Sequence, residues 1–190
     1  EPSVTATENA LVAATAARGT TVLRNAACEP HVQDLAHFLC TLGAKIEGIG
    51  TNTVTIHGGH AIGGGTHRIG PDHIEVGSFV GLAAVTGGEL TIRDAGVEHL
   101  PMIRLGFERL GVRLDVDGDV VRVPGGQQLT IFDDAGGAVP TLDDAPWPGF
   151  PADLTSIMVV VATQSRGAIL IHEKMFESRL FFVDKLVAMG

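Results

Sequence analysis

The stretch GELTIRDAGVEHLPMIRLGFERLGVRL, residues 88–114, combines a short strand pattern, an amphipathic helix pattern and a closing glycine. Ile103, Phe107 and Leu110 recur at the spacing of one helix face, which predicts a helix that packs on a core. Gly111 predicts the end of that helix, because glycine adopts a left-handed backbone conformation at little cost. The next residues, VRLDVDGDVVRVPGG, predict two strands joined by a turn, which is a β-hairpin.

Two further stretches, residues 19–46 and 167–190, repeat the same order of patterns. Each copy opens on a glycine and closes on a glycine, with spans of 24, 23 and 23 residues: Gly19 to Gly43, Gly88 to Gly111 and Gly167 to Gly190. A fixed spacing of this kind indicates an internal structural repeat. The first copy, like the second, is followed by a hairpin pattern, AKIEGIGTNTVTIHG.

A different kind of helix is expected before each opening glycine, in TENALVAATAAR, EVGSFVGLAAVT and DLTSIMVVVATQ. These segments are apolar almost all round, which predicts burial on nearly every side. A leading strand is expected ahead of each, for example in THRIG, residues 66–70. The repeat unit is therefore βαβαββ and the fold class α/β, with the chain beginning inside one unit and stopping inside another.

Composition restricts the kind of protein. The chain has 190 residues, of which 45% are hydrophobic, and a net charge of −9 with only 13 Lys and Arg, too few basic residues for a nucleic-acid surface. Its apolar runs are shorter than the roughly 20 residues that span a bilayer, and no secretory leader is visible. Cys28 and Cys40 lack CxxC spacing and suit a reducing compartment, so we expect a cytoplasmic protein.

Several motifs resemble the enolpyruvyl transferases, and within that family the branch that acts on UDP-N-acetylglucosamine. The resemblance covers essentially the whole chain in the family's order. It rests on PSVTATENALVAA (2–14), NAACEPHVQDLAHFLCTLGAKIEGIGT (25–51), GGGTHRIGPDHIEVGSF (63–79), PGFPADL (148–154) and MFESRL (175–180).

The resemblance implies an inside-out α/β barrel fold with two domains, each built from three βαβαββ units. Residues 1–70 would be the end of the domain that carries the catalytic loop, and residues 71–190 the start of the second domain, interrupted inside its second unit. The family's loop cysteine would lie outside this chain, so we expect the isolated fragment to be inactive. Half-units at both ends would also favour self-association through unpaired strands.

The implied reaction transfers the enolpyruvyl group of phosphoenolpyruvate to the 3-hydroxyl of UDP-N-acetylglucosamine and releases phosphate, the first committed step of peptidoglycan synthesis. It needs no cofactor, and it needs a carboxylate base and cations for the anionic groups. Two alternatives remain: a shikimate-3-phosphate enolpyruvyl transferase, and a non-catalytic binding protein with the same repeat fold.

Asp153 matches the family's aspartate that contacts the sugar hydroxyl and takes part in proton transfer. The alternative is a helix N-cap, because Asp before an apolar helical run is a common helix start. The corresponding positions in the other copies carry no carboxylate, so the fold itself does not require one there. Those positions are Val4 or Thr5, and His73 or Ile74.

Arg179 matches an arginine beside the family's active-site cleft. Counted back from the closing glycines, it takes the place of the apolar Val32 and Leu100. The alternative is a surface ion pair with Glu173 or Glu177. Met175 stands where the family places its backbone against the nucleotide sugar.

Ser3, Val4 and Thr5 match the family's nucleotide-binding turn at the entry to the first apolar helix, where free N–H groups meet oxygens of the ligand. The alternative is a capping motif in which Thr5 or Thr7 leads to Glu8. The family commonly has Gly at Thr5, and Arg at His73 and Cys28; these departures keep the non-catalytic alternative open.

Histidines His57, His60, His67 and His73 lie in or near a glycine-rich segment and suggest a metal site. Zinc ligands need a turn or helix that fixes their geometry, and a loose glycine-rich loop does not supply it. We therefore expect no metal. GGGTHRIG also lacks the Lys and the spacing of an ATP-binding phosphate loop.

Overall fold

The structure is a computed structural model in which residues 2–190 are described. The chain divides into two lobes. The first lobe contains the residues up to Gly70 together with Pro146–Pro148, and the second contains Pro71–Ala145 and Gly149–Gly190. Whether the lobes correspond to parts of the two domains of an enolpyruvyl transferase remains a prediction.

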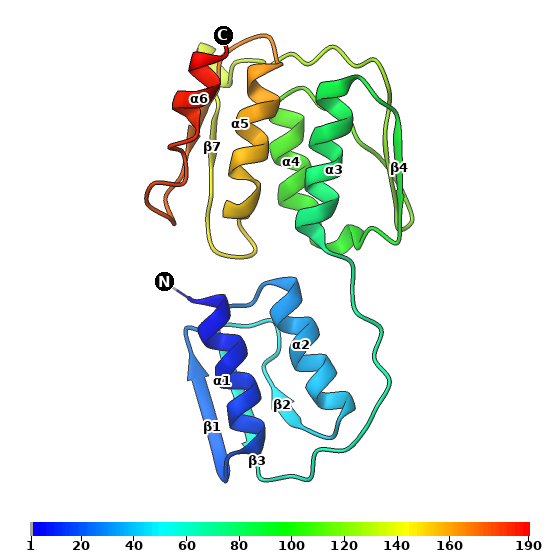
Figure 1. The fold of residues 1–190 in the computed structure, drawn as a ribbon, viewed down its shortest axis with the longest axis vertical. Coiled ribbons are helices and arrows are strands. Elements are labelled where there is room, and N and C mark those ends of the chain that lie inside the picture. Colours follow the sequence, from blue (N-terminus) through cyan, green and yellow to red (C-terminus); the bar gives the residue numbers. More distant parts are fainter. Residues whose placement is uncertain (1) are drawn as a thin grey trace. The chain divides into compact units, whose positions relative to one another are not determined.

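The first lobe follows the element order expected from the repeat (Figure 1). Helix α1 packs against β3 and α2, and the three strands form an antiparallel sheet in the order β1-β3-β2. The hairpin predicted after Gly43 is confirmed as β2 and β3. The elements are α1 (Val4–Ala16), β1 (Gly19–Arg24), α2 (Pro30–Thr41), β2 (Lys45–Glu47) and β3 (Thr53–Gly58).

The second lobe repeats this order in its first part. Strands pair in the order β4-β6-β5, again antiparallel, and the predicted hairpin is confirmed as β5 and β6. The predicted inner face of α4 is also confirmed, since Ile103, Phe107 and Leu110 are buried. The elements are α3 (His73–Thr86), β4 (Leu90–Arg93), α4 (Pro101–Arg109), β5 (Asp115–Asp117) and β6 (Val120–Val123).

The rest of the second lobe begins a new repeat. Strand β7 precedes helix α5 and pairs in parallel with β8 beyond it, as expected of a leading strand ahead of an apolar helix. The elements are β7 (Thr141–Asp143), α5 (Thr155–Thr163), β8 (Leu170–His172) and α6 (Val183–Ala188), with short 3-10 helices at Val97–His99, Ala135–Gly137 and Ala152–Leu154.

The closing glycines end their helices as predicted. Gly43 has φ 107° and Gly111 has φ 78°, both in the left-handed region. After α4, the N–H of Gly111 donates to Glu108 O at 3.0 Å and the N–H of Val112 donates to Phe107 O at 3.0 Å. This pair of bonds satisfies carbonyl groups that the end of a helix leaves free.

The strand predicted at residues 66–70 is wrong, since these residues form no strand. Polar side chains hold this segment instead: Asp34 on α2 contacts the His67 ring through Oδ1 at 2.9 Å and accepts from the Gly70 N–H through Oδ2 at 3.3 Å. No strand pairs with the segment within the described chain. An alternating pattern needs such a partner to become a strand.

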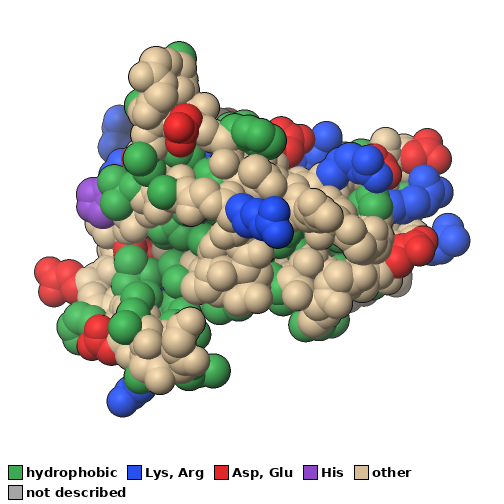
Figure 2. Space-filling view, turned by 90° about the horizontal axis from the view of Figure 1, so that it is seen from above, with side chains coloured by type: hydrophobic (Ala, Val, Ile, Leu, Met, Phe, Trp, Pro, Cys, Tyr) green, Lys and Arg blue, Asp and Glu red, His purple; other side chains and the backbone are tan. Residues whose placement is uncertain are grey.

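The expected burial of the apolar helices on nearly every side is also wrong for the described chain. Leu11 of α1 and Val80 of α3 are buried, but Val12, Phe79 and Leu82 are about half exposed. Figure 2 shows apolar side chains exposed among acidic and basic ones on the face seen there. Helices α1 and α3 therefore pack on one side and keep apolar side chains exposed on the other.

Helices α3 and α5 pack closely because glycine forms the contact surface of α3. A Cβ added to Gly77 would lie 2.6 Å from Leu154 Cδ1, and one added to Gly81 would lie 2.5 Å from Ile157 Cγ2. Such distances are too short for carbon atoms. The two glycines therefore set how near α5 and the residues before it come to α3.

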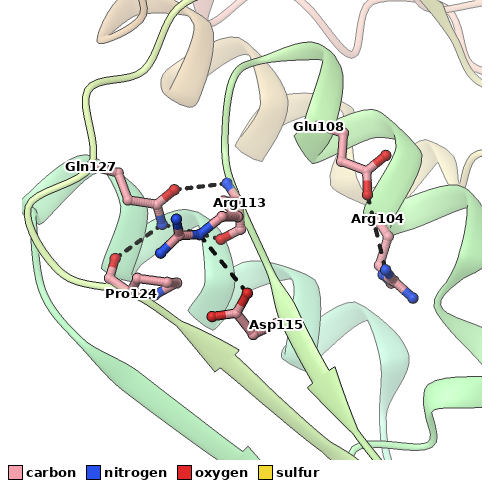
Figure 3. Close-up of polar contacts among 6 residues, drawn as sticks. All are labelled: Arg104, Glu108, Arg113, Asp115, Pro124 and Gln127. Atoms are coloured by element: carbon pink, nitrogen blue, oxygen red, sulfur yellow. Dashed lines mark hydrogen bonds and ion pairs between the residues drawn. The ribbon is translucent and has the colours of Figure 1, made fainter.

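A glutamine side chain fastens the loop that follows β6 (Figure 3). Gln127 Oε1 accepts from the Arg113 N–H at 2.7 Å, and Gln127 Nε2 donates to Pro124 O at 3.0 Å. The ion pairs in the same view are loose, with 3.8 Å between Arg113 and Asp115 and 4.0 Å between Arg104 and Glu108. Such exposed pairs contribute little to stability.

None of the helices described over residues 2–190 combines the length and the apolar character that a membrane crossing requires, and α3, the longest, has 14 residues.

Candidate active site

Charged side chains gather where the parallel strands β7 and β8 end. The last residues of these strands, Asp143 and His172, lie opposite each other, and Asp144 and Glu173 follow directly. Helix α5 lies beside this pair of strands (Figure 1). The carboxyl ends of parallel strands are where α/β proteins place their ligands.

Asp153 lies just before α5, in the 3-10 turn Ala152–Leu154. Its side chain does not cap α5, so the capping interpretation is wrong. The 3-10 turn continues directly into the helix, whereas a capping residue needs an extended backbone just before the first turn. The Asp153 carboxylate is mostly exposed and accepts a hydrogen bond from Arg179 Nη1 at 2.8 Å.

Arg179 lies in the turn between β8 and α6, not on a helix face. Helix α6 starts only at Val183, so the third copy of the repeat has a shorter helix than the other two. The suggested ion pair with Glu173 or Glu177 is wrong, because the guanidinium pairs with Asp153. It also lies over the Phe176 ring, 4.7 Å from the centroid. Two residues identified separately in the sequence thus meet in space.

Asp144 was not identified from the sequence, yet it is the most buried acid in this cluster, with 2% of its surface exposed. It accepts hydrogen bonds from the backbone N–H groups of Lys174 and Met175, the second at 3.1 Å. The N–H of Met175 is therefore already engaged. A contact between Met175 and a nucleotide sugar remains a prediction.

Glu173 was considered only as a partner for Arg179. Burial raises the pKa of its carboxyl group, and a hydrogen bond with Asp144 and the charge of Asp144 raise it further, while Thr155 and Arg179 act in the opposite direction. Glu173 Oε1 accepts from the Phe176 N–H at 3.3 Å. Glu173 Oε2 and Thr155 Oγ1 are buried and have no hydrogen-bond partner among the described residues.

A lysine and a histidine flank the same strand ends. Lys174 Nζ lies 2.7 Å from Asp143 Oδ2, and His172 Nδ1 lies 3.6 Å from Asp143 Oδ1. These side chains are partly exposed, so solvent screens their charges. Lys174 and Arg179 give the cluster cations as well as acids, which suits an anionic ligand.

Ser3, Val4 and Thr5 lie in the first lobe, at the start of α1. Ser3 is the N-cap, and its Oγ accepts from the Ala6 N–H at 3.3 Å, so the suggested cap at Thr5 or Thr7 is wrong. Thr7 lies inside the helix, where its Oγ1 accepts from the Ala27 N–H at 2.9 Å. The role of the three residues in nucleotide binding remains a prediction.

Two of the four histidines have separate acidic partners. His57 contacts Glu47 at 3.1 Å, His67 contacts Asp34 at 2.9 Å, and His73 is buried at the start of α3. Over residues 2–190, no group of three or more His, Cys, Asp or Glu side chains is placed to hold a metal ion.

The two cysteines are free thiols and both are half-buried. Burial, and after it the charge of Glu29, raises the pKa of Cys28. A raised pKa makes the reactive thiolate less available.

Comparison with known proteins connects the whole chain to one family. The family model described as EPSP synthase (3-phosphoshikimate 1-carboxyvinyltransferase) matches residues 1–190. The UDP-N-acetylglucosamine 1-carboxyvinyltransferase of Bradyrhizobium diazoefficiens is 69% identical over 190 residues, which are 100% of this chain and 44% of that protein. The Treponema denticola protein of the same name is 56% identical over 190 residues, which are 100% of this chain and 45% of its own length. The chain thus spans less than half of these relatives.

A solved structure supports the fold. The crystal structure of the enolpyruvyl transferase NikO from Streptomyces tendae is similar to this chain with a TM-score of 0.75 and 27% identity, over 98% of this chain and 43% of that one. The predicted α/β fold of the enolpyruvyl transferases is therefore confirmed.

Proposed function

Since this chain belongs to the EPSP synthase family, we propose that it carries part of the active site of a UDP-N-acetylglucosamine 1-carboxyvinyltransferase. The reaction is the transfer of the enolpyruvyl group from phosphoenolpyruvate to the sugar 3-hydroxyl, with release of phosphate. The pairing of Asp153 with Arg179 at 2.8 Å is the observation that carries the proposal. The names of the 69% and 56% identical relatives support this choice of acceptor.

In this proposal Asp153 is the base that accepts the proton of the sugar hydroxyl. The hydrogen bond described for its carboxylate, over residues 2–190, uses Oδ1, so Oδ2 is available to a substrate. A base has to reach the proton it removes within hydrogen-bond distance. An exposed carboxylate that does not cap α5 meets this requirement better than a capping one.

Arg179 has two roles in the proposal. It fixes the direction of the Asp153 carboxylate, and it brings a positive charge to a place where anionic groups react. Guanidinium groups bind carboxylate and phosphate oxygens in a defined plane. The stacking of Arg179 on Phe176 further restricts its position.

The remaining assignments follow from the same proposal. Ser3, Val4 and Thr5 bind the nucleotide at the start of α1, and the backbone of Met175 contacts the nucleotide sugar. The first lobe is the end of the domain with the catalytic loop, and the second lobe is the start of the other domain. The enzyme acts in the cytoplasm, in peptidoglycan synthesis.

Phosphate release from phosphoenolpyruvate by the full-length protein tests the proposal. We expect turnover with UDP-N-acetylglucosamine and none with shikimate 3-phosphate. If the protein turns over with shikimate 3-phosphate and not with UDP-N-acetylglucosamine, the acceptor is shikimate 3-phosphate, as in the name of the matching family.

Calorimetry with UDP-N-acetylglucosamine tests the non-catalytic alternative. We expect the full-length protein to bind the nucleotide sugar, and Asp153→Ala to bind it more weakly. Binding that is unchanged in this variant, in a protein that shows no turnover, would support a binding protein instead.

A further inference from the structure

Two acidic side chains hold the turn that follows β8. Asp144 accepts hydrogen bonds from the N–H groups of Lys174 and Met175, and Glu173 accepts one from the N–H of Phe176. Three successive N–H groups are thus fixed by carboxyl oxygens. In a turn without regular secondary structure, such bonds define the path of the backbone.

The same turn carries Arg179. The guanidinium lies over the ring of Phe176, whose N–H is bonded to Glu173, and Nη1 reaches Asp153 at 2.8 Å. The contacts therefore run without a break from the acid pair through Phe176 and Arg179 to Asp153. These contacts connect the acid pair to the arginine that pairs with the proposed base.

Asp144 is buried, and Glu173 beside it is half-buried. Asp144 is 2% exposed, and Glu173 Oε2 and Thr155 Oγ1 are buried with no hydrogen-bond partner among the described residues. Two adjacent carboxyl groups repel each other if both are ionised. A proton on Glu173, donated to Asp144, removes the repulsion, because a carboxylate oxygen has room to accept more than one hydrogen bond.

Burial, more than the neighbouring charges, favours the proton on Glu173. Its pKa is raised, first by burial and then by the hydrogen bond and charge of Asp144, against the effect of Arg179. The nearby Asp143 is partly neutralised by Lys174 at 2.7 Å. The titratable His172, 3.6 Å from Asp143, and the exposed Asp153 complete the ionisable groups around the strand ends.

We propose that Glu173 is a positioning residue of the reaction, and that its protonated carboxyl group, together with Asp144, holds the turn from which Arg179 meets Asp153. This inference rests on the proposed function of Asp153. Glu173 acts through Phe176 and Arg179.

Steady-state kinetics of the full-length protein test the role of the carboxyl group. We expect Glu173→Ala to lower kcat by about 10- to 100-fold, because a small displacement of catalytic groups has an effect of this size. Glu173→Gln keeps a neutral side chain of the same shape and should stay within about 3-fold of the wild type. Glu177→Gln, an exposed acid on the same turn, is the matched control and should not change kcat.

The dependence of kcat/KM on pH tests the role of the proton and still does so if Glu173→Ala does not fold. The wild type should lose activity on the alkaline side as Glu173 ionises, and Glu173→Gln should lack this decrease. If the wild type is active, either of two results would overturn the inference. One is that the pH profiles of the wild type and Glu173→Gln superimpose, and the other is that Glu173→Gln is as impaired as Glu173→Ala. An inactive wild type would overturn the proposed function, and the inference with it.

Discussion

Asp72 and Asp153 each precede an apolar helix of the second lobe, but they are used in opposite ways. Asp72 has an extended backbone, and its Oδ1 accepts from the N–H groups of Ile74 and Glu75 at 2.9 and 3.1 Å. Asp153 stands in a 3-10 turn and leaves the start of α5 without a side-chain cap. The difference shows that an aspartate before a helix of this fold need not cap the helix. The carboxylate of Asp153 is bonded to Arg179 instead.

The largest effect should come from removing the charge at Asp153. In the full-length protein we expect Asp153→Asn to lower kcat by about 10²- to 10⁴-fold, the usual contribution of a general base. The free energy of unfolding should change by less than about 0.5 kcal/mol, since the side chain is exposed and caps nothing. Phosphate release and urea denaturation measure the two quantities.

Asp117→Asn is the control for that experiment, because Asp117 is an exposed acid with only a loose pair to Arg122, at 3.9 Å. It should leave both quantities unchanged. A large loss of stability in Asp153→Asn, without loss of turnover, would make Asp153 a structural residue like Asp72.

Arg179 should have the next largest effect. We expect Arg179→Lys to lower kcat about 10- to 100-fold, because an ammonium group keeps the charge but not the planar contact with the carboxylate. Arg122→Lys, on the exposed face of β6, is the matched control. Equal kinetics for Arg179→Lys and the wild type would show that any cation at this position is sufficient.

Asp72 should have an effect on stability. We expect Asp72→Ala to lower the free energy of unfolding by about 1 kcal/mol, since two N–H groups at the start of α3 lose their acceptor. Thermal or urea unfolding measures the change. If Asp153→Ala destabilises the fold as much, the contrast between the two helix starts is wrong.

The smallest effect should be a change in the pH dependence of stability at Glu173. A carboxyl group whose pKa is raised in the folded chain binds its proton more readily when folded, so its contribution is lost as pH rises above the ordinary value of about 4.5. The free energy of unfolding of the wild type should therefore fall with rising pH relative to Glu173→Gln. Urea denaturation at several pH values measures the difference. If the free energy of unfolding depends on pH in the same way in the wild type and in Glu173→Gln, Glu173 and Asp144 do not share a proton.

Local signals in the sequence predicted the repeat correctly. Gly43 and Gly111 end their helices as expected, since a left-handed helix end depends on one residue and its near neighbours. The strand expected at residues 66–70 was wrong because strand formation depends on a partner elsewhere in the chain. The cap at Asp153 was wrong because whether a helix starts with an extended residue or a 3-10 turn depends on the packing around it.

The site was predicted only in part. The resemblance to the family identified Asp153 and Arg179, but no spacing rule connects residues 26 positions apart, so their pairing appeared only in the structure. Asp144 was missed, and Glu173 was taken for a surface partner. A signal did exist: each is an acid directly after a strand of a parallel pair, a place where α/β proteins gather functional groups.

The glycines of α3 bear on which substitutions the protein tolerates. Gly77 contacts Leu154, the neighbour of Asp153, and has no room for even one methyl group. A substitution at Gly77 would force the Leu154 side chain to shift, directly beside Asp153, a carboxylate 76 positions later in the chain. Selection for inactive variants should therefore recover changes on a helix that contributes none of the proposed site residues.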